Sequence, residues 1–95
     1  MDGKKRLLIV DDEPDLADMV KFRLEANGYE ILLASDGQQA LEAARREKPD
    51  LIILDVMMET RDKGFEVARQ LRADPKLAKT PIIMPHNKNH FLAFF

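Results

Sequence analysis

The sequence predicts an α/β domain in which a doubly wound parallel sheet carries helices on both faces. Four short apolar runs alternate along the 95 residues with three stretches of helical periodicity. Such an alternation of strands and helices implies right-handed crossovers and parallel strand pairing. The length suits one domain, and the apolar fraction of 45% suits a globular chain.

The first half of the chain predicts two strands, each followed by a helix. The run LLIV at Leu7 to Val10 predicts a strand that is buried on both faces. Pro14 suits the first turn of a helix that the acidic residues before it can cap, and Gly28 ends that helix. A second strand is expected over 29–34, and SDG then begins a second helix. The apolar stripes of these helices are Leu16, Val20 and Leu24 in the first, and Ala40, Leu41 and Ala44 in the second.

The second half predicts two further strands around a third helix. The run LIIL at Leu51 to Leu54 predicts a buried strand, and VMMETRDKG at 56–64 predicts a loop. A helical stripe follows that ends at ADP, and Pro81 to Met84 predicts the fourth strand. We therefore expect a domain over residues 1–84 and a tail of irregular sequence over residues 85–95. The stripe of the third helix is Phe65, Ala68 and Leu71.

Composition and charge exclude several classes of protein. The net charge of −2 argues against a nucleic-acid binder that works by bulk electrostatics. The absence of cysteine excludes disulfides and thiolate metal sites. The apolar runs are too short to cross a membrane, and the N-terminus lacks the pattern of a signal peptide. We therefore expect a cytoplasmic protein that binds neither nucleic acid nor membrane.

Carboxylates follow two of the predicted strands. Asp11 and Asp12 come after the first strand, and Asp55 comes after the third. Ligands of such a sheet bind outside the carboxyl ends of the strands, so the three carboxylates converge if these strands are neighbours. Three carboxylates repel one another unless a cation lies among them, and oxygen ligands suit Mg²⁺. An Asp pair before a helix is also a common cap, whereas Asp55 follows four apolar residues, where an unpartnered charge is costly.

Around these carboxylates the sequence resembles the receiver domains of two-component response regulators. The resemblance is carried by LLIVDDEPD, GYEILLASDGQQALE, KPDLIILDVMM and GFEVARQLRADP with TPII, from about Lys5 to Met84. It implies the flavodoxin-like receiver fold, with four of the expected five strands present and the region from helix four to helix five missing. It also implies a signalling module, not an enzyme that turns over a separate substrate.

The resemblance assigns a role to each residue of the acidic cluster. Asp55 would be the phosphoacceptor, which takes a phosphoryl group from the phosphohistidine of a sensor histidine kinase. Mg²⁺ (or Mn²⁺) would be bound by Asp12 and Asp55, by Asp11 through a water molecule, and by the backbone carbonyl of Met57. No catalytic base is implied. The chain also lacks a second aspartate two residues after Asp55, which disfavours a phosphatase that forms an aspartyl phosphate.

The sequence departs from the family pattern after the fourth strand and in the loop after Asp55. Where the family has a Thr or Ser whose hydroxyl contacts the phosphoryl group, this chain has His86. The family's lysine on the fifth strand has no counterpart before the chain ends. In the loop after Asp55 the usual proline is absent, and Glu59 adds a charge. The alternative function is therefore a receiver fragment that is defective in phosphorylation and acts as an interaction or oligomerisation module.

The tail also predicts self-association. Without a fifth strand, the fourth strand would be an edge of the sheet, and apolar faces that the last helix covers in the family would be open. We expect the chain to associate with itself through this C-terminal side. The tail is either a natural end or an out-of-frame extension of a longer receiver. Its apolar residues are Phe91, Leu92, Phe94 and Phe95.

Overall fold

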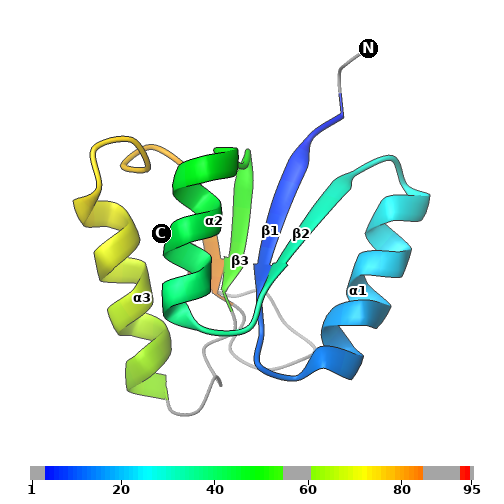
Figure 1. Ribbon diagram of the computed structural model, residues 1–95, viewed down its shortest axis with the longest axis horizontal. Helices are drawn as coiled ribbons and strands as arrows, with labels where there is room; N and C mark the ends of the chain where they lie inside the picture. Colours follow the sequence, from blue (N-terminus) through cyan, green and yellow to red (C-terminus); the bar gives the residue numbers. More distant parts are fainter. Residues whose placement is uncertain (1–3, 55–60, 85–92, 95) are drawn as a thin grey trace.

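The computed structural model describes residues 4–54, 61–84 and 93–94 of the chain. Strands and helices alternate from β1 to β4 as the sequence predicts (Figure 1). None of the described helices is long and apolar enough to cross a membrane. The elements are β1 (Arg6–Val10), α1 (Pro14–Ala26), β2 (Glu30–Ala34), α2 (Gly37–Glu47), β3 (Leu51–Leu54), α3 (Arg61–Ala73), β4 (Ile82–Met84) and β5 (Ala93–Phe94).

The strands form one sheet in the order β2-β1-β3-β4-β5. The first four strands are parallel, and the register pairs Val10 of β1 with Ala34 of β2 and with Leu54 of β3. The chain moves from β1 to β2 in one direction and then from β2 past β1 to β3 in the other, so the strand order reverses between β1 and β3. This reversal is the place where open α/β sheets bind ligands, outside the carboxyl ends of the strands. The predicted doubly wound parallel fold is thus confirmed.

The expectation that the fourth strand is a sheet edge was wrong. The two residues of β5 pair antiparallel with β4, Ala93 opposite Met84 and Phe94 opposite Ile83. The physical reason is that an open strand edge presents unpaired N–H and C=O groups, which another extended segment can satisfy. Within the described residues, the sheet thus has a fifth strand that comes from the tail and runs against the other four.

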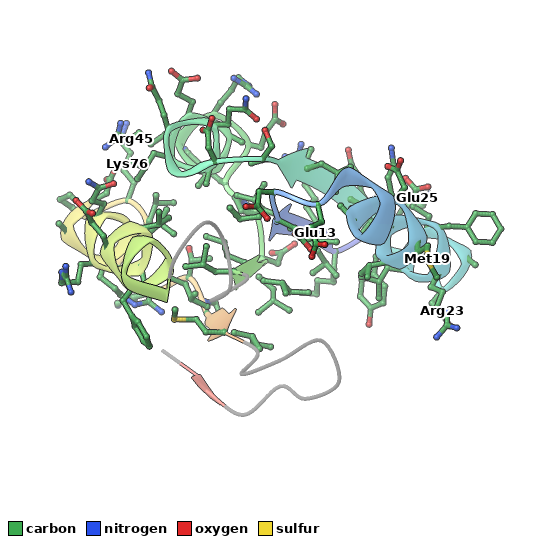
Figure 2. All side chains as sticks on the ribbon, turned by 90° about the horizontal axis from the view of Figure 1, so that it is seen from below. Glu13, Met19, Arg23, Glu25, Arg45 and Lys76 are labelled. Carbon is green, nitrogen blue, oxygen red and sulfur yellow. The ribbon has the colours of Figure 1, made fainter. Side chains whose placement is uncertain are left out.

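Two apolar layers hold the helices on opposite faces of the sheet. Leu8 and Val10 of β1 point into the layer beneath α2 and α3, and both are completely buried. Leu7 and Ile9 point into the other layer, where Leu24 of α1 packs against them. Figure 2 looks along the strands and shows α2 and α3 on one side of the sheet and α1 on the other. This alternation explains why every residue of LLIV is apolar: each face of β1 is covered.

Helix α3 starts earlier than the sequence predicts, whereas helix α2 starts where expected. Helix α3 begins at Arg61, inside the stretch 56–64 that the sequence predicted as a loop. One glycine within a helix costs only about 1 kcal/mol, so Gly64 did not stop it. Helix α2 begins as expected at SDG, because the Asp36 carboxylate accepts a hydrogen bond from the backbone N–H of Gln39 at 2.8 Å. The Gln39 side chain reaches back and accepts from the backbone N–H of Ser35 at 3.0 Å, which completes a reciprocal cap.

Candidate functional site

The candidate site lies where β1 and β3 end. The Asp11 backbone N–H donates to the carbonyl oxygen of Ala34 at 3.0 Å, which continues the β1–β2 ladder one residue beyond β1. Asp11 is therefore held by sheet geometry although it lies outside the strand. The last residues of β1, β3 and β4 are apolar and completely buried, so the ends of these strands are closely packed. They are Val10, Leu54 and Met84.

The Asp11 carboxylate is oriented by the chain that follows it. Its Oδ1 accepts a hydrogen bond from the backbone N–H of Glu13 at 2.9 Å, a local turn of the kind that aspartate forms two residues ahead. One oxygen of Asp11 is thus engaged with the backbone, and this fixes the direction of the other. Asp11 is half-buried, whereas Asp12 is exposed. The pair therefore presents one oriented carboxylate and one solvent-facing carboxylate.

Helix α1 begins immediately after this turn. Glu13 occupies the cap position with extended backbone angles, and Pro14 follows at the start of the helix, as the sequence predicted. The Glu13 side chain makes no capping hydrogen bond to the helix. Its backbone N–H is the group with a role at the site, because it holds Asp11. Figure 2 views the molecule from this end and labels Glu13 near the end of the sheet.

The sequence alone did not predict the two backbone groups that position Asp11, the N–H of Glu13 and the carbonyl of Ala34. The first has a local signal, since aspartate two residues before a helix cap often forms such a turn. The second depends on the register between β1 and β2, which no local pattern reports.

The other predicted site residues, Asp55, Met57 and His86, lie outside the described residues, as does Glu59. Within residues 4–54, 61–84 and 93–94, no three His, Cys, Asp or Glu side chains lie close enough to hold a metal ion. Asp11 and Asp12 could offer carboxylate oxygens to a metal, with neither His nor Cys in the segment that follows β1. That donor set fits a hard cation such as Mg²⁺ and does not fit zinc or copper.

Comparison with known proteins identifies the family. The family model for the response regulator receiver domain matches residues 7–91. The chain belongs to this receiver domain family. It is 46% identical over 80 residues to the alkaline phosphatase synthesis transcriptional regulatory protein PhoP of Bacillus subtilis. The aligned region covers 84% of this chain and 32% of that protein. The chain thus spans about a third of the length of this curated relative.

Solved receiver domains have the same fold. The chemotaxis response regulator CheY4 of Vibrio cholerae is 37% identical, with a TM-score of 0.78 over 85% of this chain and 67% of that one. The receiver domain of the sensor histidine kinase PA1611 from Pseudomonas aeruginosa is 28% identical, with a TM-score of 0.81 over 90% of this chain and 70% of that one. In the PA1611 structure a magnesium ion is coordinated in the active site cleft. Receiver domains are signalling modules of two-component systems, and this chain shares their fold.

Proposed function

We propose that this receiver domain accepts a phosphoryl group on Asp55 from the phosphohistidine of a sensor histidine kinase, with Mg²⁺ bound at the same end of the sheet. The register of β1 and β3 carries the proposal. Val10 pairs with Leu54 in parallel, and the residues that follow them in the sequence are Asp11 and Asp55. Two adjacent parallel strands therefore lead into carboxylates at the point where the strand order reverses.

The proposed transfer requires little covalent machinery from the protein. A carboxylate oxygen of Asp55 attacks phosphorus, the bond from phosphorus to the histidine nitrogen of the kinase breaks, and its electron pair stays on the imidazole. Phosphoryl transfer depends mainly on positioning and on charge stabilisation. The hydrogen bond from the backbone N–H of Glu13 would contribute to positioning, because it orients the carboxylate of Asp11, a proposed metal ligand through water.

Asp11 and Asp12 would hold the metal, with Asp12 bound directly and Asp11 through water. The backbone carbonyl of Met57 and the Asp55 carboxylate would complete the protein ligands. When bound, Mg²⁺ supplies neutralisation of the negative charge on the phosphoryl oxygens. The magnesium ion in the related PA1611 receiver domain supports this choice of cation.

Intact-mass spectrometry after incubation with a small phosphoryl donor tests the proposal directly. With acetyl phosphate and Mg²⁺ the protein should gain the mass of one phosphoryl group. The gain should vanish in Asp55→Asn and persist in Asp18→Asn, which removes an exposed carboxylate from the middle of α1. The proposal is wrong if wild-type protein that is folded by circular dichroism gains no mass, or if Asp55→Asn gains it equally.

The second candidate function is a receiver fragment that assembles with partners without being phosphorylated. It is favoured by His86, which stands two residues after Met84 where the family carries a hydroxyl side chain. His86→Thr separates the two candidates. If the phosphoryl gain is absent from the wild type and appears in His86→Thr, the natural chain is an interaction module. If both proteins gain the phosphoryl group, the first proposal stands.

A further inference from the structure

The end of the sheet opposite the candidate site carries a concentration of positive charge. Four segments form this end, at the start of the strands and the end of the helices: 4–6, 27–30, 45–50 and 72–80. They contain nine Lys and Arg residues and four Asp and Glu residues, a net charge of +5 in a chain whose total is −2. The rest of the molecule is correspondingly acidic. We call this end the basic face.

The four acidic residues of the basic face are engaged by cations or backbone groups of the same face. Glu47 forms an ion pair with Arg6 and accepts from Arg46 Nε at 3.0 Å. Glu30 lies 3.4 Å from Arg6 Nε, and Asp50 accepts from the Arg6 backbone N–H at 2.9 Å. The hydrogen bond from Arg6 lowers the pKa of the Glu47 carboxyl, and the hydrogen bond from Arg46 lowers it further by a smaller amount. Glu47 and Glu30 thus pair with arginines and Asp50 with a backbone N–H, so these carboxylates leave the lysines of the face without ion-pair partners.

The fourth carboxylate is held in the same way. Asp74 accepts from Arg45 Nε at 2.7 Å and from the backbone N–H of Lys76 at 2.9 Å. These hydrogen bonds, the one from Arg45 first, lower the pKa of Asp74. The pair joins the last turn of α2 to the loop after α3, and so fixes how the two parts of the basic face lie relative to each other.

Five lysines of the basic face remain without such partners. All five are exposed, and their ammonium groups form no ion pair with any residue that the structure describes. They come from three different segments, so folding gathers charges that are far apart in the sequence. The five are Lys4, Lys5, Lys48, Lys76 and Lys79.

A shallow hollow of about 440 Å³ lies within the basic face. Arg45 and Lys76 stand at its rim, and Figure 2 shows them close together, one from α2 and the other from the loop after α3. Ala73 and Pro75 supply apolar wall. Asp74 also lines the hollow, where its carboxylate pairs with Arg45, so Lys76 is the lining cation that forms no ion pair among the described residues. An ammonium group beside apolar wall suits a carboxylate on a short hydrocarbon stem.

We propose that the basic face binds an acidic segment of a partner protein. Charge complementarity is the basis of the proposal, since an excess of unpaired lysines attracts and orients a chain rich in Asp and Glu. The chemistry favours carboxylates over the phosphates of nucleic acid or lipid. Bidentate phosphate contacts need arginine, and the arginines of the face are already engaged. Carboxylates of the face pair with Arg6, Arg45 and Arg46, and the carbonyl oxygens of Leu77 and Ala78 accept from Arg72.

Fluorescence anisotropy with a labelled peptide of alternating Glu and Ala tests the proposal on the full chain. The peptide should bind at low salt, and binding should weaken at least about tenfold in 0.5 M NaCl, where surface charges are screened. Lys76→Glu should weaken binding about three- to tenfold. Arg69→Glu makes the same change in net charge on another side of α3, away from the hollow, and should leave the affinity within about twofold of the wild type.

Three results would overturn the proposal. The first is that Lys76→Glu and Arg69→Glu weaken peptide binding equally while both proteins remain folded, because binding would then depend on net charge alone. The second is preferential binding of a single-stranded oligonucleotide or of vesicles that contain phosphatidylserine, which would assign the face to phosphates. The third is no measurable binding of the peptide at low salt.

Discussion

The contact between Gly37 and Val67 gives the sharpest test of how α2 and α3 pack. Gly37 is the first residue of α2, and Val67 is a buried residue of α3. A Cβ at position 37 would lie 2.6 Å from Cγ2 of Val67, well inside the 3.4–4 Å of ordinary van der Waals contact. Valine is stiff about its first side-chain torsion, so this methyl group cannot turn away without cost.

The expected effect of Gly37→Ala follows from two opposing terms. Overpacking a well-packed contact costs about 1–3 kcal/mol. Replacing glycine in a helix gains at most about 1 kcal/mol through lost freedom of the unfolded chain. The net should be a destabilisation of about 1 kcal/mol, which lowers the Tm of a chain of this size by about 4–8 °C.

A double-mutant cycle isolates the contact. Val67→Ala removes the methyl group, so Gly37→Ala in that background should be neutral or stabilising by up to about 1 kcal/mol. Gly28→Ala is the control: its φ of +93° disfavours alanine, and no atom lies within 4 Å of the added Cβ, so its cost should not depend on Val67. Urea unfolding measures all six proteins. A Gly37→Ala effect that is the same in both backgrounds would refute the reasoning.

Three further predictions concern the core, a helix cap and the pH dependence of stability. Leu8→Ala should cost about 2–5 kcal/mol in urea unfolding because Leu8 is completely buried, whereas Phe22→Ala, at a side chain that is 77% exposed, should change stability by less than about 0.5 kcal/mol. Asp36→Ala should cost about 0.5–2 kcal/mol, with Asp36→Asn largely restoring the cap. The pKa of Asp74 is lowered by Arg45, so its contribution is present above the ordinary carboxyl range near pH ~4 and is lost as pH falls through the lowered value. Urea unfolding of Asp74→Asn between neutral and acidic pH should therefore show a shallower loss of stability than the wild type, and an equal slope would exclude the pair as a cause.

The sequence was most informative where local signals and burial agree. The runs at Leu7 to Val10 and Leu51 to Leu54 predicted strands at their observed positions, because a strand covered on both faces must be apolar throughout. The start of α3 was missed, since charged residues around a single glycine favour neither helix nor loop. The antiparallel pairing of Ala93–Phe94 with β4 was missed because strand partners are set by tertiary contact and leave no local pattern.

The carboxylates of the candidate site were singled out from the sequence for a related reason. Carboxylates that directly follow buried strands stand out in the sequence, and the α/β alternation then determines that parallel strands end on one side. Asp11 and Asp12 were singled out from the sequence, and the structure places them directly after β1, which pairs in parallel with β3. The hydrogen bond from the backbone N–H of Glu13 to Asp11 has a local signal, an aspartate two residues before a helix cap, but this signal alone does not determine whether the turn forms.

The candidate carboxylate site and the basic face should act independently, because they lie at opposite ends of the sheet. Strand β1 has five residues, and at about 3.3 Å per residue the acidic and basic ends lie about 16 Å apart. Surface charges are screened beyond about 8 Å at physiological ionic strength. Lys76→Glu should therefore leave the Mg²⁺ affinity of the acidic end unchanged within about twofold, as measured by calorimetric titration, while peptide binding weakens. A parallel change in both would mean that the two ends are coupled through the packing of α2 and α3 rather than through charge.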